Sequence, residues 1–367
     1  MNVVVYVPNL GGKTGSPIRA LNIIYGLRKF GVGYNLNLVS SGFDDELMNS
    51  FTCYSTQTYG GIKQAVSFAV QESRADFILC ITHAHVNIIN KVARKCNVPL
   101  FVDIHGIRSL EILEEPIRLL RKIKNIYECL PWFLGLFGAR KIFCANPKLY
   151  DLMRIIFWGR AIKVCGITDV SSFKYAENES RSKHVKILYA GNLNAYQGVD
   201  LLLDAIELIG DDRGLKFYLA SNSDISNVKL RDRIIDLKKS SNLYVIDPIA
   251  YKLYPKFLAT MDVFVIPRKF SLTAYLAFPQ KIVESMSSGK CVIATDIAPH
   301  RFALKDPLCG ILCKPDPKNL ANAIIRSKNR KLRMVLGKLA RKKATESYDI
   351  SVQIPKIIRG IEEGIAS

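Results

Sequence analysis

The sequence lacks any apolar run that approaches 18 residues, and its first residues, MNVVVYVP, carry no basic leader. A bilayer-spanning helix needs about 20 mostly apolar residues and a signal peptide needs a basic leader, so we expect neither. The cysteines number nine, an odd count, and Cys80, Cys144 and Cys291 lie inside apolar runs. Scattered cysteines of this kind do not build a disulfide framework and favour a reducing compartment. We therefore expect a cytoplasmic protein.

Acidic residues are few, with 32 Asp and Glu against 52 Lys and Arg, a net charge of +20. This excess favours an anionic partner such as a membrane surface, a nucleotide or nucleic acid, and charge alone does not choose among them. Metal motifs are scarce as well. The sequence contains no D-x-D motif. Near His83 and His85 there is no Cys, Asp or Glu at a spacing typical of metal ligands. Their position after an expected strand suggests that these two histidines line an acceptor pocket.

The string GGKTG invites a P-loop interpretation, which fails because the glycine required five positions before Gly12 is Val7. What remains is a strand, a glycine loop and a helix at each of two places, near residues 2–30 and 185–209. With 367 residues, 49% of them hydrophobic, the chain is long enough for two domains of about 150 to 200 residues each. The polar run at 174–184 separates them, so we predict domains at 1–178 and 184–348.

The segment FPQKIVESMSSGKCVIATD, from Phe278 onward, predicts an anion-binding loop and helix followed by a buried strand. Pro279 suits the first helical position, where free backbone N–H groups and the adjacent Lys281 can face a diphosphate. Glu284, one turn later, can accept hydrogen bonds from a sugar diol. Gly289 is expected to end the helix before the apolar run CVIAT.

Two strings together, this segment and GNLNAYQGVDLLLDA at 191–205, resemble retaining GT-B glycosyltransferases of the family-4 type. The resemblance implies an α/β GT-B fold, with two Rossmann-like domains facing a cleft and a crossover helix at 349–367 that packs on the first domain. It implies transfer of a sugar from a nucleotide sugar to an acceptor hydroxyl with retention of configuration. It also implies that neither a metal nor another cofactor takes part.

The resemblance assigns roles to individual residues. His105 and Lys281 would be catalytic, His105 facing the donor sugar and Lys281 neutralising the diphosphate. An alternative for His105 is a structural histidine bonded to a neighbouring carbonyl. The residues expected to bind the donor are Gly15, Arg19, Gly191, Asn192, Gln197, Pro248, Ile249, Phe278, Pro279, Gln280 and Glu284.

The sequence departs from the family pattern at three positions. Asn192 and Gln197 stand where many members carry the arginine and lysine that hold the diphosphate, and Leu276 replaces a glutamate that contacts the transferred sugar. We expect either weaker donor binding or a cation supplied from elsewhere. UDP-linked and GDP-linked donors both stay open. The alternative function is a catalytically weak GT-B module that binds an anionic membrane or polymer.

Residues 116–137 combine a basic amphipathic helix with the string PWFLGLF. This combination predicts docking on an anionic membrane, with Trp132 and Phe133 supplying the apolar contact. The alternative is a helix that packs on the sheet. If the segment docks, the protein lies on the inner face of the membrane and its acceptor is lipid-linked or a polysaccharide. We expect no nucleic-acid partner.

Overall fold

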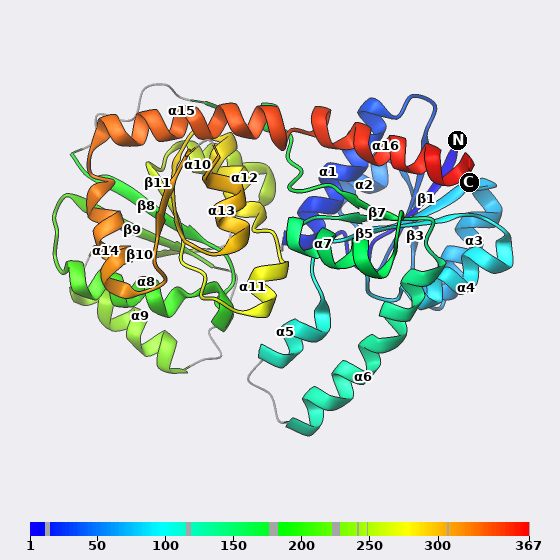
Figure 1. Ribbon diagram of the computed structural model, residues 1–367, viewed down its shortest axis with the longest axis horizontal. Helices are drawn as coiled ribbons and strands as arrows, with labels where there is room; N and C mark the ends of the chain where they lie inside the picture. Colours follow the sequence, from blue (N-terminus) through cyan, green and yellow to red (C-terminus); the bar gives the residue numbers. More distant parts are fainter. Residues whose placement is uncertain are drawn as a thin grey trace. The chain divides into compact units, whose positions relative to one another are not determined.

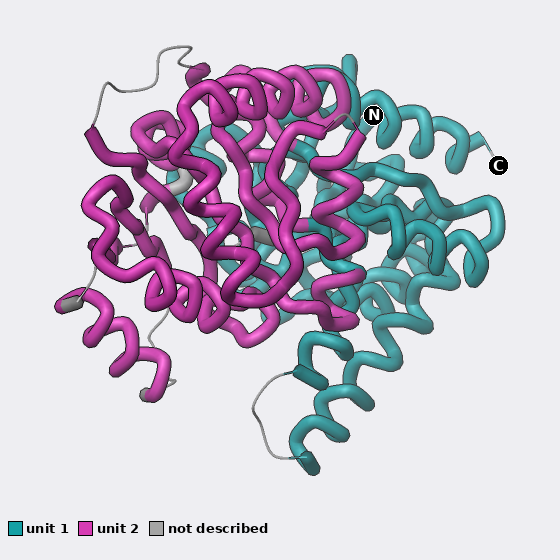
Figure 2. The backbone as a smooth tube through the Cα atoms, turned by 60° about the vertical axis from the view of Figure 1, so that its left-hand side comes forward, with its two compact units in different colours: residues 1–167, 276–278, 350–367 teal, residues 168–275, 279–349 magenta. Residues whose placement is uncertain are grey.

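The computed structural model describes residues 1–11, 15–114, 119–175, 183–221, 228–240, 242–247, 249–306 and 308–366. The chain forms two compact units, coloured separately in Figure 2. Unit 1 contains residues 1–167, 276–278 and 350–367, and unit 2 contains residues 168–275 and 279–349.

The division between the units falls before the predicted boundary in the polar run 174–184, of which 176–182 lie outside the described residues. Backbone hydrogen bonds explain the difference. Thr168 N donates to Tyr348 O at 3.0 Å, and Val170 N donates to the Asp349 carboxylate at 3.0 Å. These bonds tie the segment after residue 167 to the end of unit 2.

The sheet of unit 1 has seven parallel strands in the order β3-β2-β1-β4-β5-β6-β7. In register, Val3 of β1 lies opposite Leu36 of β2 on one side and Phe77 of β4 on the other. Short apolar runs supply most of these strands, as expected for a sheet covered on both faces. The strands are β1 (Asn2–Tyr6), β2 (Asn35–Ser40), β3 (Thr52–Ser55), β4 (Phe77–Cys80), β5 (Leu100–Ile104), β6 (Lys141–Cys144) and β7 (Ala161–Lys163).

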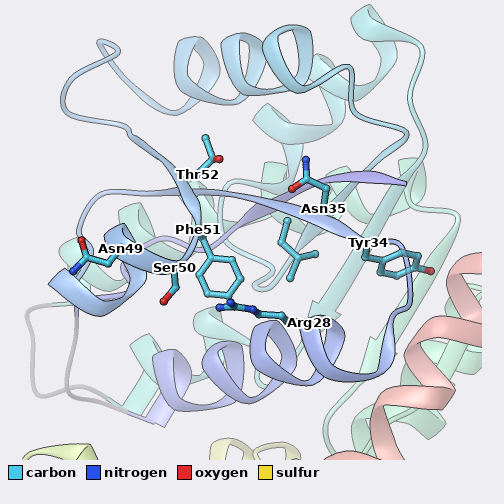
Figure 3. Close-up of a pocket in the computed structure, with 8 residues that line it drawn as sticks. Arg28, Tyr34, Asn35, Asn49, Ser50, Phe51 and Thr52 are labelled. Atoms are coloured by element: carbon cyan, nitrogen blue, oxygen red, sulfur yellow. The ribbon is translucent and has the colours of Figure 1, made fainter.

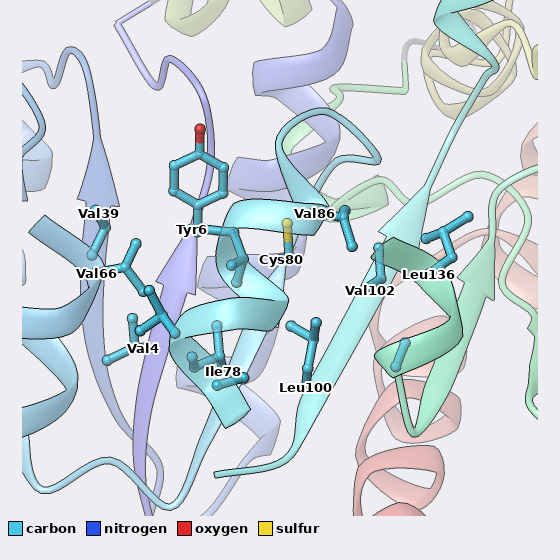
Figure 4. Close-up of a cluster of buried hydrophobic side chains, with 14 of the residues drawn as sticks. Val4, Tyr6, Val39, Val66, Ile78, Cys80, Val86, Leu100, Val102 and Leu136 are labelled. Atoms are coloured by element: carbon cyan, nitrogen blue, oxygen red, sulfur yellow. The ribbon is translucent and has the colours of Figure 1, made fainter. Parts of the chain in front are cut away.

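Helices cover both faces of this sheet (Figure 1). One face packs α3, α4 and α7 against side chains such as Val4 and Tyr6, the cluster drawn in Figure 4. The other face packs α1 and α16 against Val3 and Val5. The elements are α1 (Gly15–Phe30), α2 (Asp45–Ser50), α3 (Ile62–Ser73), α4 (Val86–Cys96), α5 (Arg108–Glu114), α6 (Leu119–Gly135), η1 (Leu136–Gly138), α7 (Pro147–Ile156) and α16 (Ile350–Ala366).

Unit 2 has a sheet of six parallel strands in the order β10-β9-β8-β11-β12-β13. Its main core lies between this sheet and α8, α9 and α14, and α12 packs against α15 and β12. The strands are β8 (Val185–Ala190), β9 (Leu215–Ala220), β10 (Leu243–Ile246), β11 (Val263–Ile266), β12 (Cys291–Thr295) and β13 (Ile311–Cys313). The helices are η2 (Val170–Ser172), η3 (Ala195–Gln197), α8 (Val199–Ile209), α9 (Val228–Ser240), η4 (Tyr251–Leu253), α10 (Tyr254–Ala259), α11 (Leu272–Leu276), α12 (Gln280–Ser287), α13 (Ala298–Leu304), α14 (Pro317–Arg326) and α15 (Arg330–Ser347).

The strand order fixes where each unit can bind a ligand. In unit 1 the order reverses between β1 and β4, and in unit 2 it reverses between β8 and β11. Parallel α/β sheets bind ligands beyond the carboxyl ends of the strands at such a reversal. The loops after β1, β4, β8 and β11 therefore form the expected ligand edges.

No helix in the described ranges is long and apolar enough to cross a membrane. All nine cysteines are free thiols.

Candidate functional site

Glu284 lies one turn into α12, which follows α11 in the connection from β11 to β12 and runs from the carboxyl edge of the sheet. The glutamate is fully buried, with Lys281 Nζ at 3.0 Å from its Oε2. Besides this ion pair, its oxygens have no hydrogen-bond partner among the described residues. Burial raises the pKa of Glu284, and the nearby Lys281 opposes that rise. The carboxylate thus keeps acceptor capacity for hydroxyl groups.

Lys281 is held between this carboxylate and an aromatic ring. Its Nζ lies 3.8 Å from the centroid of the Tyr254 ring, a cation–π distance. The side chain is still 29% exposed, so the ammonium can reach an anion in front of the helix.

Pro279 lies one position earlier than predicted. It is the N-cap, with Gln280 as the first residue of α12, and Gln280 Nε2 donates to the hydroxyl of Thr168 at 3.1 Å. The helix ends where the sequence predicted, since Gly289 follows it with φ of +65°. Phe278 groups with unit 1.

The loop after β8 carries Gly191, Asn192 and Gln197. Tyr189 donates its hydroxyl to Asn192 O at 2.5 Å, and the Asn192 side chain is exposed. Gly198 has φ of +71°, and a Cβ there would lie 1.9 Å from Pro267 O. Only glycine permits this approach, so Gly198 brings the loop after β8 against the end of β11.

Arg268 is a site residue that our sequence analysis missed. It follows β11, is 9% exposed, and donates from Nε to Gln197 Oε1 at 3.0 Å. Its Cζ lies 5.6 Å from the Tyr196 ring. The dipeptide Pro267-Arg268 after a buried apolar run was the available signal, because it places a cation at the carboxyl edge.

The expected nucleobase loop is only partly described. β10 ends at Ile246, Pro248 lies outside the described residues, and Ile249 is half-buried. Their proposed role in donor binding stays a prediction.

Arg19 of unit 1 takes part in a buried ion pair rather than standing open at the first loop. Its Nε and Nη2 donate to the two oxygens of Asp103 at 2.9 and 2.7 Å, and Nη2 also donates to Val164 O at 2.9 Å. Burial alone would raise the pKa of Asp103, but the Arg19 guanidinium holds it below its usual value. Gly15 begins α1, and residues 12–14 before it lie outside the described part.

His105 follows β5, with Nδ1 3.8 Å from Asp103 Oδ2, too far for a hydrogen bond. Its Nδ1 is buried and has no hydrogen-bond partner among the described residues. Among the described residues, the His105 Nδ1 therefore makes no hydrogen bond to a carbonyl, as the structural alternative would require of this nitrogen.

Aromatic and imidazole rings gather at the strand-order reversal of unit 1. Tyr6 Oη lies 3.1 Å from His85 Nδ1, and the Trp132 ring centroid is 5.1 Å from that of His85. His83 Nε2 accepts from Arg108 N at 2.9 Å. Burial and neighbouring positive groups lower the pKa of His83 to about 3, so it is neutral at physiological pH. In the part of the chain that the structure describes, no three His, Cys, Asp or Glu side chains form a candidate metal site.

A separate pocket of about 360 Å³ lies in unit 1 between Arg28, Tyr34, Phe51 and Thr52 (Figure 3). Thr52 begins β3 and the lining residue Asn35 begins β2. The pocket therefore lies at the amino ends of these strands, away from the ligand edge.

Comparison with known proteins agrees with the α/β architecture of two parallel sheets. Residues 184–329 match the family "Glycosyl transferases group 1". No curated protein is similar enough in sequence to count as a relative. Among solved structures, HepE from Anabaena, in complex with UDP and glucose, is 16% identical with a TM-score of 0.76, over 99% of this chain and 100% of HepE.

Two further structures share the fold over most of their length. Sucrose-phosphate synthase from Thermosynechococcus elongatus is 15% identical with a TM-score of 0.76, over 100% of both chains. WaaG, a glycosyltransferase involved in lipopolysaccharide biosynthesis, is 13% identical with a TM-score of 0.70, over 94% of this chain and 95% of WaaG. The chain thus has the GT-B fold predicted from its sequence, and residues 184–329 match the glycosyl transferases group 1 family.

Proposed function

We propose that this protein transfers a sugar from a nucleotide-sugar donor, UDP- or GDP-linked, to an acceptor hydroxyl. Glu284 carries the proposal: a fully buried carboxylate at the ligand edge of unit 2, paired only with Lys281 among the described residues. A ribose diol would satisfy its free acceptor sites, and Lys281 with the start of α12 would face the diphosphate. The UDP and glucose in the HepE complex support a UDP-linked donor.

Retention of configuration is part of this proposal. The acceptor oxygen would attack the anomeric carbon on the face that the leaving diphosphate occupies, while the bond to the phosphate oxygen breaks and that oxygen takes the acceptor proton. Protein cations would stabilise the charge that develops on the leaving group. His105 stays our candidate for a group that contacts the sugar, and we expect the reaction to need no metal.

Nucleotide binding and turnover together test this function. We expect UDP or GDP at 100 times its dissociation constant to raise stability by about 2.7 kcal/mol in a thermal-shift experiment. Slow hydrolysis of the matching nucleotide sugar should accompany binding. Binding with no hydrolysis, even with added lipid or glycan acceptors, would favour the catalytically weak module instead.

We also propose that α6 docks on an anionic membrane, through a different face from the one first predicted. Trp132 and Phe133 do not supply the contact: Trp132 packs on His85, and Phe133 packs on Phe157 in the core. The second half of α6 lies against α4, where a Cβ on Gly135 would lie 2.4 Å from Asn87 N. Leu136 is also buried.

The first half of α6 instead contacts α5, where Lys122 Nζ donates to Leu113 O at 2.7 Å, and stands away from the sheet of unit 1 (Figures 1 and 2). Its apolar side chains are exposed: Leu120 is 82% exposed, Ile123 56% and Tyr127 74%. It therefore does not pack on the sheet, and Ile117 lies outside the described residues. Arg121 and Lys124, both exposed, stand beside this stripe, the combination expected for an interfacial helix. A membrane-held acceptor would then be the natural substrate.

Co-sedimentation with vesicles containing phosphatidylserine tests the docking. Replacing Leu120, Ile123 and Tyr127 with serine should abolish most binding, because these side chains supply the apolar contact. A matched control replaces three exposed apolar residues elsewhere, Val32, Leu208 and Val335, which are 97%, 63% and 57% exposed. Equal loss in both triple variants contradicts the assignment. If the wild-type protein does not bind the vesicles but forms dimers through Leu120, Ile123 and Tyr127, the proposal is wrong.

A further inference from the structure

A second exposed apolar surface of unit 1 lies at the end of α7. Trp158, in the turn between α7 and β7, is 89% exposed, and Ile155 in the last turn of α7 is 75% exposed. Trp158 is one of two tryptophans in the chain. Folded proteins bury most of the surface of their tryptophans, so an indole in this position indicates a contact with something outside the chain.

The turn that carries Trp158, residues 157–160, is fixed to the end of α6. Phe157 is buried, and its ring centroid lies 4.8 Å from that of Phe137 in η1. Arg160 Nη1 donates to Phe137 O at 2.9 Å. Gly159 has φ of +71°, a conformation that favours glycine and lets the chain reverse toward β7. The indole is therefore held beside η1.

The exposed face of α6 reaches this turn. Beyond Leu120, Ile123 and Tyr127, exposed apolar residues continue along α6 and into η1 at intervals of three or four residues, which keeps them on one face. These further residues are Leu130, Leu134 and Phe137. Because α6 leads from α5, which follows the carboxyl end of β5, to η1, which precedes β6, the stripe runs from the ligand edge of unit 1 to the opposite edge of its sheet.

The charge around the turn matches an anionic surface. Residues 130–165 contain six Lys and Arg and one acidic residue, Asp151, which pairs with Lys148 at 3.5 Å. Arg154 and Arg160, both exposed, flank Trp158 in the sequence. A soluble polyanion would contact the arginines but leave the apolar side chains in water.

A second copy of the chain fits this surface less well than a bilayer does. Two copies paired through the same surface would bring the like charges of both together. An anionic bilayer accommodates both kinds of side chain, because the arginines contact headgroups while the indole lies at the depth of the interface.

We propose that Trp158 is a second membrane anchor, which inserts its indole into the interface of an anionic bilayer at the opposite end of α6 from Leu120. The inference rests on the docking of α6 proposed above. Contacts at both ends of the stripe lay α6 along the bilayer. The ligand edge of unit 1 then opens along the membrane surface, where a membrane-held acceptor diffuses.

Tryptophan fluorescence tests this anchor. Trp132→Phe leaves Trp158 as the only tryptophan of the chain. Its emission should shift to shorter wavelength on vesicles containing phosphatidylserine, and lipids brominated on the acyl chain should quench it, because the indole enters the interface. Trp158→Phe is the matched control, in which Trp132, packed on His85, should show neither change.

Co-sedimentation measures what the indole contributes to binding. Trp158→Ser should weaken vesicle binding roughly tenfold, because the apolar area of the indole no longer leaves water. Val32→Ser, which changes an exposed residue outside the stripe, should leave binding unchanged.

The outcomes separate this inference from the docking of α6. Unchanged Trp158 emission in a Trp132→Phe protein that sediments with the vesicles overturns the inference alone, as does wild-type binding by Trp158→Ser. An emission shift that appears without vesicles and grows with protein concentration indicates a second copy and also overturns it. If the wild-type protein does not sediment with the vesicles, the docking of α6 is wrong as well.

Discussion

Replacing Glu284 with alanine is expected to weaken UDP binding by a factor of about 30 or more, which corresponds to about 2 kcal/mol. The carboxylate is fully buried, and Lys281 at 3.0 Å is its only close partner among the described residues. The ribose hydroxyls of a bound nucleotide would lose this buried acceptor. Calorimetric titration with UDP measures the change directly.

A glutamate outside the site provides the control. Glu207 on α8 is 48% exposed and pairs with Arg233 at 2.8 Å, so Glu207→Ala removes a carboxylate from the same unit without touching the ligand edge. We expect its UDP affinity to match the wild type. If both variants bind UDP as the wild type does, Glu284 does not contact the nucleotide.

The ionised carboxylate of Glu284 should also lower the stability of the folded protein. Burial raises the pKa of Glu284 above its unfolded value of about 4.3. With a raised folded pKa, the ionised group lowers stability above that pKa, and the loss disappears as pH falls below the unfolded value. Glu284→Gln should therefore keep or increase stability at pH 7 while binding UDP more weakly, as expected where binding and stability conflict.

Much of the fold was predictable because the strands are short apolar runs. CVIAT forms β12 and is buried throughout, and VKILYA forms β8. The sequence alone also predicts a helix over residues 62–73, and α3 has the same bounds. By contrast, β3 consists of TCYS, a short strand at the edge of the sheet, and no apolar run marks it. An edge strand pairs with one neighbour and is less buried than a central strand. The pattern of apolar residues alone therefore does not reveal it.

The candidate site divides in the same way. Glu284 and Lys281 lie on one turn of one helix, so their spacing placed them together. Arg268 and Gln197 are 71 positions apart, and only the parallel neighbours β8 and β11 bring them into contact. Trp132 and Phe133 show the reverse error. Their apolar character suggested exposure to lipid, but both are half-buried, with Trp132 against His85 and Phe133 against Phe157.

Arg19 was predicted to bind donor phosphates, and its contacts lead to a different expectation for stability. Arg19→Met should lower the free energy of unfolding of unit 1 by about 3 to 5 kcal/mol, because it leaves the carboxylate of Asp103 buried without its cation. Lys148→Met is the control. Lys148 pairs with Asp151 at 3.5 Å on the surface, both being about half exposed, so its loss should cost less than about 1 kcal/mol. Urea unfolding followed by circular dichroism compares them.

Two further measurements identify the origin of that loss. Replacing both partners, Arg19→Met with Asp103→Leu, should restore part of the stability, because no uncompensated charge remains in the core. In the wild type, the ion pair holds the pKa of Asp103 below the unfolded value of about 3.9. Its contribution is therefore complete above that value and is lost as pH falls through the folded pKa, so the difference between wild type and Arg19→Met should shrink in acid. A difference that stays constant down to pH 2 would mean that Arg19 stabilises unit 1 through packing and its bond to Val164 rather than through its charge.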